Sequence, residues 1–105
     1  MLDTTPLIIA VDRFADRLRS APQSRLQRGA AAEGLAAARE LARRAQRIEA
    51  PDREPYVLPD AGLFTVGDQL AVAGRDLALA LETAPSAELD EAVHWVNEAA
   101  ARAFA

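Results

Sequence analysis

The sequence has no cysteine and no lysine, and aromatic residues make up only 5% of it. A chain without cysteine forms neither disulfides nor thiolate metal sites, and small secreted domains more often carry disulfides, so we expect a cytoplasmic protein. All twelve basic residues are arginine, and sixteen acidic residues bring the formal net charge to −4. This acidic balance argues against nucleic acid binding, for which basic patches with interleaved aromatic residues are typical.

Long apolar runs are missing as well. No run approaches the roughly 20 residues that a membrane-spanning helix needs, so we expect no membrane contact. The short apolar run in MLDTTPLIIAV follows no positively charged region, which is untypical of a signal peptide. The strict alternation of apolar and polar residues that indicates a β-strand is also absent. A chain of 105 residues has the length of one ordinary domain, and we predict a single helical domain over residues 1–105.

Apolar residues at helical spacing are present along most of the chain, and prolines interrupt them. Together these patterns predict four helices, over about residues 6–20, 22–50, 65–84 and 87–104. The second helix contains no proline, and its two glycines only weaken it, so we expect one unbroken helix of about 29 residues and about 43 Å.

Residues 51–64 contain three prolines at four-residue intervals, which forbid a helix there. The segment is too apolar for a free linker, so we expect an ordered loop that either caps the bundle or forms a binding rim. Helices joined by short breaks favour antiparallel neighbours. We therefore predict an all-α antiparallel four-helix bundle with a long second helix and a proline-rich ordered loop between helices 2 and 3.

The second helix is unusually rich in small side chains, as the stretch RGAAAEGLAAARELARRAQR shows. Three of them, Ala30, Gly34 and Ala38, fall on its apolar face, where missing bulk allows a neighbouring helix to approach closely. The same small residues can instead leave space for a ligand. In that case Ala30, Gly34 and Ala38 form the floor of a pocket that Tyr56 closes from the loop.

Some large apolar side chains lie off the core stripes of their helices. A single four-helix layer does not obviously bury them all, so we predict that they form an interface. These residues are Val72, Leu79, Trp95 and Ile9. The alternative is that the long loop and the second helix cover them within one chain.

Charge is unevenly distributed along the chain. Residues 22–50 have a net charge of +3, whereas the chain from Thr65 onward has −5. On the outer side of the second helix lie Arg25, Arg28, Arg39, Arg43 and Arg47. This face indicates either an acidic partner, most naturally the acidic last helix of the same or a neighbouring chain, or a solvated surface with local pairs such as Glu40 and Arg44.

Patterns typical of catalysis or metal binding are weak. Glu91 and His94 have the Glu-x-x-His spacing of di-iron bundle sites, but such a site needs two pairs and this chain has one histidine. Ala71 and Gly74 match the small residues of a helix-turn-helix, yet no turn residue and no basic recognition helix follow. Each serine lies beside a helix break, where capping is the ordinary role. We predict no catalytic residue, no metal and no cofactor.

Two functions remain after these exclusions. The first is a non-enzymatic helical protein–protein interaction module that forms a homodimer or binds another protein. The second is a small-ligand-binding or sensor bundle with a pocket under the 51–64 loop. Solution mass separates them most directly, since only the first function requires association.

Overall fold

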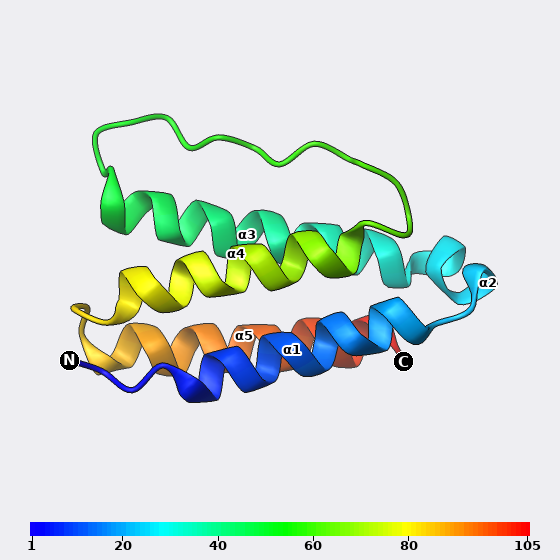
Figure 1. Cartoon of the computed structure of the whole chain (residues 1–105), viewed down its shortest axis with the longest axis horizontal. Coiled ribbons are helices and arrows are strands. Elements are labelled where there is room, and N and C mark those ends of the chain that lie inside the picture. The colour runs from blue at the N-terminus through cyan, green and yellow to red at the C-terminus, as the bar shows by residue number, and fades with distance from the viewer.

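The computed structural model describes all 105 residues and consists of helices and loops without a β-strand. Four long helices lie side by side (Figure 1): α1 (Thr5–Ser20), α3 (Ala31–Glu49), α4 (Val66–Leu81) and α5 (Ser86–Ala103). Two short helical pieces precede α3, namely α2 (Gln23–Arg25) and η1 (Leu26–Ala30). The chain is therefore the all-α helical bundle that its periodicity predicts. None of these helices is long and apolar enough to cross a membrane.

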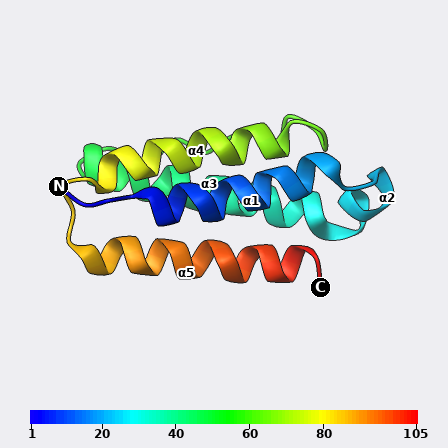
Figure 2. The same cartoon turned by 60° about the horizontal axis from the view of Figure 1, so that its bottom comes forward.

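The four long helices occupy the corners of the bundle. Both α1 and α3 pack against α4 and against α5, so α4 and α5 lie at opposite corners. Figure 2 shows α5 on the side of α1 and α3 that faces away from α4. Each side of the bundle therefore presents a different pair of helices.

The direction of α4 differs from the prediction. In Figure 1, α1 and α5 run one way, whereas α3 and α4 both run the other way. Contacts agree, because Gly34 near the start of α3 packs against Val66 at the start of α4. The expectation of an entirely antiparallel bundle is therefore wrong. The 51–64 loop spans up to about 46 Å when extended, which is enough to return along a molecule whose longest dimension is 40 Å.

The predicted unbroken second helix is also wrong, because the chain bends at Gly29. This glycine has φ 143° and ψ −17°, a conformation that residues with a side chain rarely adopt. Around it the helix widens into a single π turn, in which the Ala31 N–H donates to the Leu26 carbonyl. The bend places η1 against α3 and α5 and buries Leu26, so α3 begins only at Ala31.

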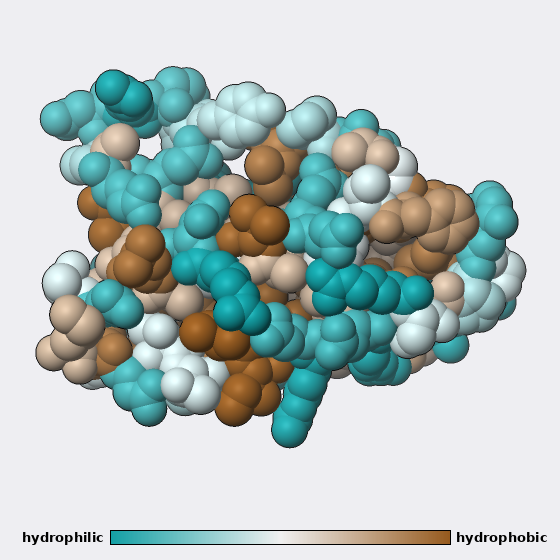
Figure 3. All heavy atoms as spheres, viewed as in Figure 1, coloured by the Kyte–Doolittle hydropathy of each residue, from teal (hydrophilic) through white to brown (hydrophobic).

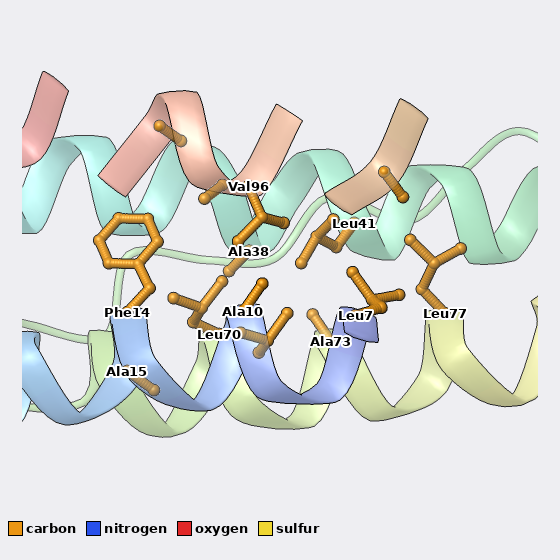
Figure 4. Packing of buried hydrophobic residues seen from close by; sticks show 14 of the residues in the cluster. Leu7, Ala10, Phe14, Ala15, Ala38, Leu41, Leu70, Ala73, Leu77 and Val96 are labelled. Carbon is orange, nitrogen blue, oxygen red and sulfur yellow. The ribbon is translucent and has the colours of Figure 1, made fainter. Parts of the chain in front are cut away.

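The core is one cluster of 26 buried apolar residues, and half of them are alanines. Leu7 and Phe14 from α1 meet Leu70 from α4 and Leu41 from α3 at its centre (Figure 4). Helices approach most closely at glycines. A Cβ on Gly74 would lie 2.5 Å from Cγ1 of Val11. The small residues of this chain therefore bring helices together.

Candidate functional site

An apolar ridge runs along the outer side of α4. It consists of Val72 and Leu79, whose exposed fractions are 63% and 66%. Seven residues correspond to about two helical turns, so both side chains point the same way. Neither the loop nor the second helix covers them. We call this pair the α4 ridge.

Ion pairs separate the α4 ridge from the exposed Ile9 of α1. Arg75 of α4 lies 3.1 Å from Asp12 of α1, and Arg19 of α1 lies 2.8 Å from Asp68 of α4. Hydrogen bonding to Asp68 raises the pKa of Arg19. Figure 3 shows hydrophilic side chains crossing this face between separate apolar clusters. Ile9 is therefore at most a peripheral member of the predicted interface.

A small hollow adjoins the α4 ridge on the side of the loop. Its volume is about 250 Å³, and Val72 and Leu58 line it together with Ala42 of α3. Asp68, Gln69 and Asp76 form its polar edge. The α4 ridge thus combines a projecting leucine with a recess two turns away along the same helix.

Trp95, the fourth predicted interface residue, lies elsewhere. It is half-buried on α5, and the Arg44 guanidinium lies 5.8 Å from its ring centroid. Because α4 and α5 occupy opposite corners, the structure does not bring Trp95 together with Val72 and Leu79. A helical wheel shows that a residue lies off the core side of its own helix, but it does not show which other element the residue contacts.

The loop 51–64, here called the strap, is held along α3 and α4 by side chains. Gln46 makes two hydrogen bonds to Tyr56, donating from Nε2 to the backbone carbonyl at 3.0 Å and accepting the N–H at 2.6 Å. Arg39 donates from Nε to the Leu58 carbonyl at 2.7 Å. From α4, Gln69 donates to the Pro59 carbonyl at 3.0 Å. These hydrogen bonds hold the strap along the length of the bundle, so it caps neither end.

Between the strap, α3 and Trp95 lies an open cavity of about 610 Å³, which we call the strap groove. Tyr56 lines it, as the sequence predicts. The other predicted pocket residues, Ala30, Gly34 and Ala38, are buried in helix contacts and do not line it. A Cβ on Gly34 would lie 2.6 Å from Val66, so no ligand space exists there. The alanines that do line the groove are Ala31, Ala32 and Ala36.

The five arginines predicted to face an acidic partner do not form one surface. Arg25 and Arg28 lie before or within the bend and line a recess near the C-terminus. Arg39 and Arg43 line the strap groove. Arg43 and Arg47 line a further cavity of about 580 Å³, opposite Glu88 and Glu91 of α5. The bend at Gly29 therefore divides the set, and only Arg43 and Arg47 face the acidic helix within the same chain.

A charge cluster on α3 connects these two cavities. Glu40 accepts hydrogen bonds from Arg43 and, at 2.7 Å, from Nε of Arg44. Burial alone raises the pKa of Glu40, but the hydrogen bonds and charges of Arg43 and Arg44 outweigh it, so the net pKa is lowered. The carboxylate is thus held ionised between two arginines.

This lowered pKa predicts a pH dependence of stability. A carboxyl group with a lower pKa in the folded state stabilises the fold above its unfolded pKa, and this contribution is lost as pH falls through the folded value. We expect Glu40→Gln to lower the free energy of unfolding at pH 7, and the difference from wild type to shrink below about pH 4.3. Urea unfolding at pH 7, 5, 4 and 3 measures this difference. The exposed Glu49→Gln is the control, and a Glu40→Gln deficit that stays constant with pH would contradict the assigned ion pairs.

The only histidine is paired with a neighbouring carboxylate. His94 lies on the exposed side of α5, with Nε2 3.0 Å from Oε1 of Glu98. No group of three or more histidine, aspartate or glutamate side chains is placed to hold a metal ion. The candidate sites are the α4 ridge and the strap groove.

Comparison of the chain with protein-family models, with curated proteins and with solved structures found no match.

Proposed function

We propose that this protein is a non-enzymatic helical interaction module that self-associates through the α4 ridge. The observation that carries the proposal is the exposure of Val72 and Leu79 on one side of α4. Water-exposed apolar side chains that project together gain free energy when a second surface covers them. Because the chain lacks cysteine, we also propose a cytoplasmic location.

The ridge and its hollow are arranged for pairing with a second copy. In a two-fold symmetric dimer each subunit contributes the same surface. If the two α4 helices pair antiparallel, with the symmetry axis midway between residues 72 and 79, then residue 79 of one copy meets residue 72 of the other. Leu79 of each copy then reaches the hollow that Val72 and Leu58 line. The dimer thus contains two identical contacts, each between Leu79 of one copy and the hollow of the other.

Charge also favours a copy of this chain at this face. Together α1 and α4 carry four arginines and four aspartates, which are Arg13, Arg17, Arg19, Arg75, Asp12, Asp16, Asp68 and Asp76. On α5, four acids accompany one arginine. Two α5 faces would repel each other, whereas two α1/α4 faces meet with almost no net charge.

Leu79→Asp is expected to weaken the dimer strongly. The substitution places one unpaired carboxylate from each copy in the interface. Changes at central interface residues typically cost about 2 kcal/mol or more. We therefore expect the dissociation constant to rise at least about 30-fold. Folding of one chain should hardly change, because the side chain is exposed there. Sedimentation equilibrium measures the constant.

The matched control is Val57→Asp on the strap, because Val57 is 66% exposed, as Leu79 is. It lies away from the α4 ridge and should leave the dissociation constant unchanged. Equal weakening by both substitutions would contradict the assignment of the interface to α4.

A further inference from the structure

The two ends of the strap groove differ in chemistry. One end is apolar and lies beside the start of α3, where the walls are Leu26, Ala31, Ala32, Leu35, Leu63 and Val66. The other end, one to three turns further along α3, carries Arg39, Glu40 and Arg43 between Tyr56 and Trp95. Ala32 and Ala36 are exposed on the side of α3 between these ends. Their small side chains leave the groove open along its length. A molecule lying in the groove would therefore meet apolar atoms at one end and guanidinium groups at the other.

The polar end has arginine hydrogen-bond donors that have no partner within the protein. Arg39 uses Nε for the Leu58 carbonyl, and its two terminal nitrogens have no partner in the protein. Arg43 holds Glu40 through Nε and Nη2 and keeps Nη1 unpaired. Glu40 also accepts a hydrogen bond from Arg44, which lines the neighbouring cavity. The remaining acid, Asp60, accepts the N–H of Gly62 within the strap at 2.9 Å and forms an ion pair with neither Arg39 nor Arg43.

We propose that the strap groove binds a free amphiphilic anion, a molecule with one apolar chain and a single carboxylate headgroup. The headgroup accepts hydrogen bonds from Arg39 and Arg43, which lie one turn apart on α3 and match the planar geometry of a carboxylate. The apolar chain lies over Ala32 and Ala36 and contacts Leu35 and Leu63. The volume of about 610 Å³ falls in the range of about 300–1,000 Å³ that is usual for small-molecule sites. This site is distinct from the α4 ridge and does not depend on self-association.

The chain carries its own reporters of binding, because its only tryptophan and its only tyrosine both line the groove. The probe is dodecanoate below its micelle concentration, titrated into the full-length chain while Trp95 emission is recorded. The Leu79→Asp variant serves as the background, so that self-association does not change during the titration. We expect a saturable change in Trp95 emission with dodecanoate and none with dodecylamine, which has the same chain and the opposite charge.

Two substitutions locate the site. Ala36→Leu places a larger side chain in the groove at a position that is exposed in the free protein. We expect it to abolish the Trp95 emission change with dodecanoate and to leave the circular dichroism spectrum unchanged. Arg39→Gln removes the charged donor and should weaken binding about tenfold. Because Arg39 also holds the strap, the Ala36→Leu result stands independently of it. Arg47→Gln is the matched control, as Arg47 is exposed on the same helix but does not line the groove, and it should bind like the background.

Three outcomes would overturn the proposal. The first is the lack of a saturable response to dodecanoate, and the second is an equal response to dodecylamine. The third is unchanged binding by Ala36→Leu. A response to an acidic amphipathic peptide without one to dodecanoate would assign the groove to a protein partner, which also overturns it.

Discussion

Phe14→Ala is expected to lower the free energy of unfolding by about 3–5 kcal/mol, because truncating a buried phenylalanine removes transfer energy and leaves a cavity. Phe14 is 1% exposed at the centre of the core. Its ring also meets Phe104 edge to face, with centroids 6.3 Å apart and planes at 77°. Domains of this size have a total stability of about 5–15 kcal/mol, so the loss is a large fraction of the total. Urea denaturation followed by circular dichroism measures the change.

Phe64→Ala is the matched control for this prediction. Phe64 is 72% exposed beside the start of α4, so its truncation should change stability by no more than about 0.5 kcal/mol. Similar losses in both variants would show that the α1 stripe does not form the core.

Gly74→Ala is the second large effect, although alanine is the better helix former by about 1 kcal/mol. The new Cβ would lie 2.5 Å and 2.8 Å from the two γ carbons of Val11. Valine has one strongly preferred rotamer in a helix, so Val11 cannot turn away, and α1 and α4 must move apart. We expect a net loss of about 1–3 kcal/mol, typical of overpacking. Thermal and urea unfolding measure it.

A double-mutant cycle with Val11→Ala tests the cause of this loss. Val11→Ala removes the two γ carbons that the new Cβ would meet most closely and keeps only Cβ of residue 11, which lies 3.0 Å away, so Gly74→Ala should cost much less in that background than in the wild type. Additive losses would mean that Gly74 acts through something other than its contact with α1.

The helices and the core follow from local pattern. Leu7, Val11, Phe14 and Leu18 recur at spacings that place them on one side of a helix, and all four are buried. In α4 the same reasoning separates the buried Leu70 and Leu77 from the exposed Val72 and Leu79. Burial on one side is a property of a single helix, and its sequence carries that information.

The bend and the direction of α4 depend on more than local pattern. A glycine inside an apolar repeat usually costs only about 1 kcal/mol in a helix, and nothing beside Gly29 distinguishes it from Gly34. One adopts a positive φ and the other lies in a helix contact. The direction of α4 depends on the path of the strap. Its length and its prolines allow it to cross the whole bundle, whereas the antiparallel expectation assumed a short connection.

The candidate surfaces could be predicted only in part from the sequence, for the same reason. Periodicity identifies the α4 ridge, because exposure belongs to one helix. The strap groove belongs to α3, α5 and the strap together, so Ala32, Ala36 and Arg39 could not be grouped with Trp95 from spacing alone. The hydrogen bonds from Gln46 to Tyr56 and from Arg39 to Leu58 join residues that are close only because the strap runs back along α3.

The most direct test of self-association is the mass of the wild-type chain by light scattering across a dilution series. One chain has a mass of 11.2 kDa. We predict a mass that approaches twice this value at high concentration and falls towards it on dilution, while Leu79→Asp reaches the same mass only at concentrations at least about 30-fold higher. A wild-type mass of one chain at every concentration would contradict the proposed dimer.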